Sequence, residues 1–72
     1  MKNRLVYHVA PDRDLERWAV IKEGAKQPKA EGLSKEKAIR AARRLVEKKA
    51  QPALVLIYKT RYIIEQQLQF ST

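Results

Sequence analysis

The segment SKEKAIRAARRLVEKK, residues 34–49, contains the pattern that decides the fold. Its apolar positions are Ala38, Ile39, Ala42, Leu45 and Val46. At 3.6 residues per turn these side chains share one face of an α-helix. Ser34 stands where its hydroxyl can accept a hydrogen bond from a free backbone N–H of the first turn. At the other end, Pro52 prevents the helix from continuing. The pattern predicts one amphipathic helix over about residues 35–49, with a narrow apolar face suited to packing on a sheet.

Segments rich in β-branched and aromatic residues flank this helix, two on each side. They are residues 4–10, 18–22, 53–58 and 62–70. Both glycines lie in residues 24–33, which we expect to be a loop. The order predicts a two-layer α+β domain, ββαββ, in which a four-stranded antiparallel sheet carries the helix on one face. The 72 residues are enough for one domain, residues 1–72, with an ordered core of about residues 4–70.

One helix cannot cover both faces of a four-stranded sheet. The strands nevertheless carry apolar residues on both faces, as in the neighbouring pairs Val6 and Tyr7, and Val55 and Leu56. Because large exposed apolar patches mark interaction sites, this pattern favours a homodimer or another partner on the open face. A sheet with scattered exposed apolar residues explains the same pattern.

The chain is strongly basic, with 16 Lys and Arg against 8 Asp and Glu and a net charge of +8. Residues 34–49 alone contain seven basic and two acidic side chains. Such a field raises the local concentration of polyanions. The charge therefore indicates either nucleic acid as a partner or a basic surface that serves solubility or meets an acidic protein.

The basic residues of the helix are concentrated on one side. Lys37, Arg40, Arg44 and Lys48 fall within about 80° of one another, roughly opposite the apolar face. These four residues, called the ridge below, predict contacts to a phosphate backbone without base reading. Further candidates for this interface are Lys26, Lys59 and Arg61.

Aromatic residues offer a second route to nucleic acid. The candidates for base stacking or partner contact are Tyr7, Trp18, Tyr58 and Tyr62. Core or dimer contacts are the other interpretation of the same residues, and the signature of the common RNA-binding sheet module is absent from the sequence.

The sequence contains no catalytic constellation. It has no cysteine, and His8 is its single histidine. A histidine base needs a nucleophile and an orienting carboxylate, and a zinc site needs three or four ligands, which are normally His or Cys. We therefore expect no enzyme activity, catalytic residue, metal site, cofactor or small-molecule substrate. No apolar run is long enough for a signal peptide or a membrane span, so we expect a cytoplasmic protein without membrane contact.

Four segments of the chain resemble a family of small bacterial and phage proteins that carries a domain-of-unknown-function label. They are YHVAP (residues 7–11), WAVIKEGA (residues 18–25), SKEKAIRAARRL (residues 34–45) and LVLIYK (residues 54–59). The chain departs from the family pattern at Arg17, where a glycine is usual, and at Thr60 and Arg61, where the family has an Asp-Gly turn. The resemblance implies a ββαββ fold and no assigned activity.

The leading functional interpretation is a small non-enzymatic binding module that contacts the phosphate backbone of nucleic acid through the ridge. The alternative is a protein-interaction or structural module, homodimeric through the open sheet face or bound to an acidic protein, with no role in nucleic-acid binding. Salt distinguishes them, because phosphate contacts weaken steeply as salt increases and a sheet-mediated dimer does not.

Overall fold

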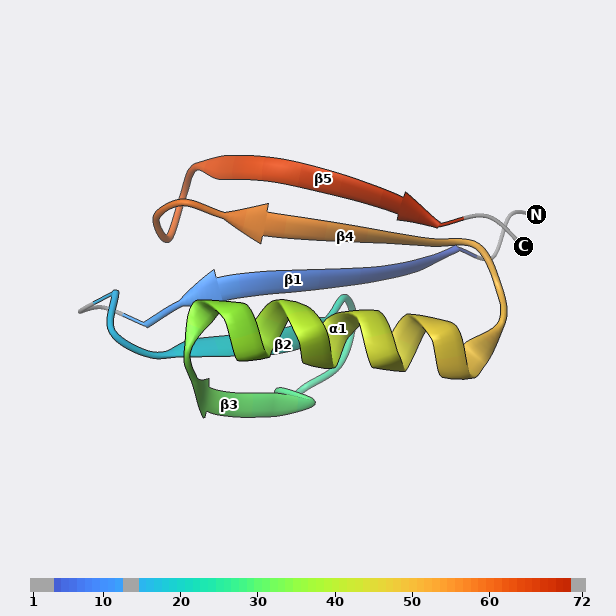
Figure 1. Ribbon diagram of the computed structural model, residues 1–72, viewed down its shortest axis with the longest axis horizontal. Coiled ribbons are helices and arrows are strands. Elements are labelled where there is room, and N and C mark those ends of the chain that lie inside the picture. The colour runs from blue at the N-terminus through green and yellow to red at the C-terminus, as the bar shows by residue number, and fades with distance from the viewer. Residues whose placement is uncertain (1–3, 13–14, 71–72) are drawn as a thin grey trace.

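The computed structural model describes residues 4–12 and 15–70 (Figure 1). Along the chain, the elements are β1 (Leu5–Pro11), β2 (Trp18–Lys22), β3 (Ala30–Leu33), α1 (Lys35–Lys49), β4 (Ala53–Tyr58) and β5 (Ile64–Phe70). The strands form one sheet in the order β3-β2-β1-β4-β5. Helix α1 lies on one face of this sheet and contacts β1, β2, β3 and β4. The fold is α+β with two layers, as the sequence predicted.

The sheet has five strands, so the prediction of four strands was wrong. The additional strand, β3, lies in residues 24–33, which were expected to form a loop. Gly24 adopts φ +89° just after β2 and lets the chain turn back. Ala30 then pairs with Val20 and Leu33 with Trp18, with an irregular register between these two pairs. A four-residue strand with small side chains gives almost no hydrophobic pattern, which is why the sequence did not reveal it.

The sheet is mixed, so the prediction of an antiparallel sheet was also wrong. Strands β1 and β4 are parallel neighbours, with Tyr7 opposite Val55 and Val9 opposite Ile57. The chain builds β1, β2 and β3 outward to one edge, and α1 then carries it back along the sheet to the other side of β1 (Figure 1). A helix that returns the chain in this way starts the next strand in the direction of the previous one. The other pairs are antiparallel.

The core lies between α1 and the sheet. Its fully buried strand residues include Tyr7, Val9, Val20, Val55 and Ile57. From α1 the core receives Ala38, Ala42 and Val46, which confirms the apolar face predicted for the helix. Because Ala38 and Ala42 are 0% exposed, their small side chains allow α1 to approach the sheet closely.

The ends of α1 agree with the sequence signals. The Ser34 hydroxyl accepts a hydrogen bond from the Lys37 backbone N–H at 3.2 Å. At the other end, Ala50 adopts the left-handed conformation with φ 53°, and its N–H donates to the carbonyl of Val46 at 3.3 Å. Both arrangements satisfy backbone groups that a helix end leaves free. The helix therefore begins and ends where its sequence predicts.

The last strand begins later than the sequence predicted. Strand β5 starts at Ile64 rather than at residue 62, and the Lys59 N–H closes the loop by donating to the carbonyl of Ile63 at 2.7 Å. The register shifts between Ile57 and Tyr58, which pair with Gln66 and Ile64, so Glu65 is the extra residue of a bulge. This longer loop takes the place of the two-residue turn that an Asp-Gly sequence would favour.

Candidate functional site

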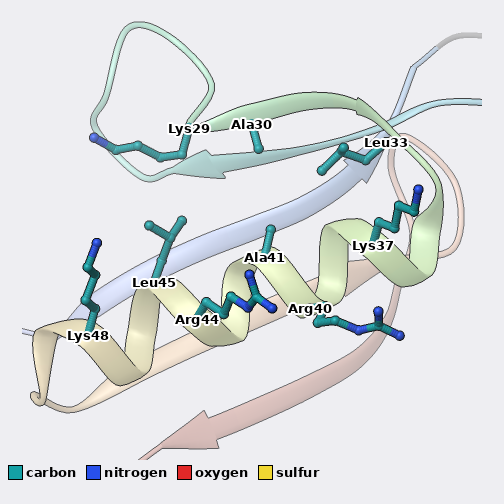
Figure 2. A pocket seen from close by; sticks show the side chains of 9 residues that line it. All are labelled: Lys29, Ala30, Leu33, Lys37, Arg40, Ala41, Arg44, Leu45 and Lys48. Carbon is teal, nitrogen blue, oxygen red and sulfur yellow. The ribbon is translucent and has the colours of Figure 1, made fainter.

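The ridge lies beside a groove between α1 and β3. All four ridge residues line this groove, together with Lys29 from the end of the loop before β3 (Figure 2). The exposed side chains of the ridge come from successive turns of α1, so the helix fixes their spacing at about 6 Å for every four residues. The structure therefore brings the ridge together in one site and adds Lys29, which sequence reasoning did not identify.

The floor of the groove is apolar. Ala41 and Leu45 point from α1 toward the strand that carries Ala30 and Leu33 (Figure 2). The groove has a volume of about 450 Å³ and is open to solvent. Sequence reasoning assigned Leu45 to the core and did not consider Ala41. The sequence did not reveal β3, and the position of this strand makes the two side chains the helix side of the groove's floor.

The charge around the groove has one sign. Its lining residues include five cations and no carboxylate. Within residues 4–12 and 15–70, no carboxylate forms an ion pair with a ridge residue. Glu31, the acidic residue of β3, lines a separate depression with Ala19 and Ile21 on the other face of the sheet. The cations of the groove are therefore available to an external anion.

The three additional basic candidates lie elsewhere. Lys26 is exposed in the loop between β2 and β3. Lys59 and Arg61 lie in the loop between β4 and β5, on the side of the sheet away from β3, and the Arg61 guanidinium is 5.5 Å from the centre of the Tyr62 ring. None of the three lines the groove. The candidate site is thus smaller than the set of residues that the sequence predicted.

The four aromatic candidates are divided between the core and the surface. Tyr7 is 1% and Trp18 is 7% exposed, and both belong to the core, so neither ring offers a free face to a base. Tyr58 is half-buried on the open face of the sheet, and Tyr62 is 83% exposed in the loop before β5. The structure therefore contradicts a stacking or partner role for Tyr7 and Trp18, because the fold uses both rings to fill its core.

His8 is at the centre of a hydrogen-bonded group that the sequence did not reveal. Its Nδ1 lies 2.9 Å from the Tyr58 hydroxyl and its Nε2 lies 3.0 Å from Glu23 Oε1. Donation from Nε2–H to the carboxylate leaves Nδ1 to accept from the hydroxyl. His8 comes from β1 and Tyr58 from β4, whereas Glu23 lies just after β2, and the three residues line neither the groove nor the depression at Glu31. This group joins β1, β4 and the turn after β2 on the open face, and only the strand order brings its members together.

A second polar contact joins α1 to β5, the edge strand at the opposite end of the sheet from β3. Lys35 Nζ donates to Glu65 Oε1 at 2.6 Å and lies 5.2 Å from the centre of the Trp18 ring. The hydrogen bond from Lys35, with the positive charge of its ammonium group, lowers the pKa of Glu65, and Lys59 adds a smaller effect of the same sign. Lys35 is therefore engaged within the fold, unlike the ridge.

These features define a small α+β domain with a cationic groove between α1 and the edge strand β3. The chain belongs to the family DUF2188, described as an uncharacterized protein conserved in bacteria, whose model matches residues 7–70. This match confirms the resemblance read from the four sequence segments. No curated protein and no solved structure shows significant similarity to the chain. In residues 4–12 and 15–70, no helix is long and apolar enough to cross a membrane.

Proposed function

We propose that this protein is a small non-enzymatic binding module that contacts the phosphate backbone of nucleic acid through the ridge. The observation that carries the proposal is the set of five cations around one groove, without a carboxylate among the lining residues. Phosphate contacts supply most of the affinity of sequence-independent binding, and Lys and Arg provide them. The net charge of +8 favours the approach of the same partner.

The length of the ridge sets the expected strength of binding. Lys37 and Lys48 are eleven residues apart, which corresponds to about 16 Å along the helix axis. A ridge of this length contacts about three or four phosphates, so the slope of log K against log salt is expected to be about −3 to −4. The affinity is expected to be micromolar or weaker at physiological salt, as for other sequence-independent contacts.

The test compares two variants of equal charge. One replaces the four ridge residues with glutamine, and the other replaces four exposed basic residues outside the groove, namely Arg4, Arg17, Arg43 and Lys49. Binding to labelled DNA and RNA is measured at about 50 and 200 mM salt, the range over which phosphate contacts weaken strongly. The ridge variant is expected to lose binding and the control variant to keep most of it. Equal losses in both variants would show that net charge, and not the ridge, attracts the nucleic acid.

A second candidate function is self-association through the open face of the sheet. The residues that the three inner strands direct to this face include Val6, Ile21, Leu54 and Leu56, and none of those within the strands is Lys, Arg, Asp or Glu. The one carboxylate described beside His8 on this face is Glu23, which follows β2. A partly apolar face without basic residues in its inner strands, on a basic chain, favours a protein partner, with a second copy as the simplest one. An acidic protein bound to the ridge would account for the charge without nucleic acid.

The size of the open face argues against a stable dimer. The three inner strands, about 4.8 Å apart and about 20 Å long, cover roughly 300 Å² for each copy, and the two edge strands raise this to roughly 500 Å² at most. Stable interfaces bury about 800 Å² on each partner. We therefore rank self-association below nucleic-acid binding. Sedimentation at increasing protein concentration tests it, and a dimer that persists unchanged at high salt would reverse the ranking.

A further inference from the structure

The groove differs from a simple cationic surface because it has an apolar floor. The floor consists of Ala41 and Leu45 on the helix side and Ala30 and Leu33 on the strand side, with the cations above it (Figure 2). Its volume of about 450 Å³ falls within the range of about 300–1,000 Å³ that is typical of ligand sites. A ligand that fills this groove needs an apolar surface as well as negative charge.

A nucleic-acid duplex provides only one of these two surfaces. Its bases are stacked and paired inside, so a duplex placed on the ridge presents phosphates and leaves the apolar floor in contact with water. A single strand exposes the faces of its bases, and proteins bind such strands by covering base faces while basic residues follow the backbone. The combination of an apolar floor and a cationic border therefore fits a single strand better.

The edge strand adds groups that can pair with a base. Strand β3 is at the end of the strand order and pairs only with β2 among the described strands, so the backbone groups on its outer edge have no strand partner. These N–H and C=O groups run beside the strand side of the floor, which Ala30 and Leu33 form. Unpaired bases carry donors and acceptors on their exposed edges, which is how sequence-specific RNA recognition proceeds.

The direction of the side chains agrees with this division of roles. Ala41 and Leu45 point toward β3, the Arg40 side chain extends away from the strand, and Lys37 and Lys48 lie at the two ends of the floor (Figure 2). Bases on the floor would thus lie between α1 and β3, with their phosphates on the ridge side. The floor has no aromatic side chain, so apolar contact with alanine and leucine takes the place of ring stacking.

We infer that the groove between α1 and β3 binds single-stranded nucleic acid, with unpaired bases on the apolar floor, base edges facing β3 and phosphates on the ridge. This inference rests on the proposed function and adds a strand preference to it. The five cations around the groove, with no carboxylate among its lining residues, favour an anionic ligand over a neutral one. An acidic peptide shares the charge of nucleic acid but not the flat faces of its bases, so the test includes one.

The experiment measures the binding of a fluorescent oligothymidine and of a duplex of equal length at about 50 mM salt. Ala41→Gln places a polar side chain on the floor without changing charge, and glutamine is a good helix former. This variant is expected to bind the single strand about fivefold to tenfold more weakly, which corresponds to the loss of part of one base contact, and to bind the duplex as the parent does. Leu33→Thr tests the strand side of the floor in the same way. Ala25→Gln, in an exposed loop, is the control.

The outcomes separate the two proposals. If neither oligonucleotide binds the parent, the proposed function fails and the inference fails with it. If both bind equally and the floor variants have no effect, the ridge contact stands and the groove assignment is overturned. If polyglutamate of equal charge displaces the single strand as well as unlabelled oligothymidine does, the site recognises charge alone and the assignment to nucleic-acid bases is overturned. A single-strand preference that both floor variants remove supports the inference.

Discussion

Lys35 Nζ and Glu65 Oε1 lie 2.6 Å apart, and this contact joins the first turn of α1 to β5, the edge strand that α1 does not cover. The hydrogen bond and the charge of Lys35 hold the pKa of Glu65 below its usual value of 4.5. The carboxylate is therefore more stable in the folded than in the unfolded chain. Its contribution is present above the unfolded pKa and is lost as pH falls through the lower, folded pKa.

We predict that Glu65→Gln lowers stability slightly at pH 7 and that its difference from the parent disappears in acid. Thermal unfolding of both proteins from pH 7 to pH 2 measures this, and an NMR titration of Glu65 shows directly whether its pKa is lowered. The effect is small because both side chains are partly exposed and water screens the pair. A difference between the two proteins that stays constant across this range would show that the ion pair does not cause it.

The close approach of α1 to the sheet gives a second prediction. Ala42 is 0% exposed, whereas its neighbour Ala41 is only partly buried at the floor of the groove. Ala42→Leu forces additional atoms into a filled core and is expected to lower the free energy of unfolding by about 1–3 kcal/mol. Ala41→Leu makes the same chemical change and is expected to cost little. Urea unfolding measures both, and equal costs would contradict the packing described for α1.

The helix was predictable because its signals are local. The apolar spacing, the Ser34 cap and Pro52 all lie within one stretch of the chain, and the observed helix has the expected bounds. The strand order was not predictable in the same way. Whether β1 pairs with β4 in parallel depends on the path of α1 across the sheet, and no residue of either strand encodes that path.

The candidate site shows the same division between local and distant signals. The ridge follows from helical periodicity alone, because its four residues lie on one helix. Lys29, Ala30 and Leu33 join the site only through β3, which pairs with β2 around the turn at Gly24. The contact of His8 with Tyr58 spans 50 residues along the sequence and depends on the same strand order.

The group around His8 provides a third prediction. Tyr58→Phe removes the hydroxyl that lies 2.9 Å from His8 Nδ1 while it keeps the ring. The loss of one partly buried hydrogen bond is expected to lower the free energy of unfolding by about 0.5–1.5 kcal/mol. Tyr62→Phe is the matched control, because that ring is 83% exposed, and its effect is expected to stay within about 0.5 kcal/mol. If the two variants are equally stable, the hydroxyl contributes nothing through His8.

The edge strand beside the groove depends on Gly32. This residue adopts φ +72°, which costs a residue with a side chain about 1–2 kcal/mol. A Cβ added at Gly32 would meet nothing within 4 Å, so any cost of Gly32→Ala comes from the backbone alone. We expect this variant to lower the free energy of unfolding by about 1 kcal/mol. Hydrogen exchange of β3 is expected to accelerate more than that of β1, and equal exchange in the two strands would contradict a local effect.

The end of α1 also has a residue with positive φ, but here the residue is an alanine, so we expect a change to glycine to increase stability. Ala50 holds φ 53° and ψ 42° as the last residue of the helix cap, although glycine is the residue that this conformation favours. Ala50→Gly removes the steric conflict of the Cβ, and it also makes the unfolded chain more flexible, which offsets part of the gain. We expect a net increase of about 0.5 kcal/mol in the free energy of unfolding, measured in urea. Because Ala50 is exposed and does not line the groove, nucleic-acid affinity is expected to stay unchanged. A loss of stability would mean that the conformational freedom gained by the unfolded chain exceeds the strain relieved at the end of α1.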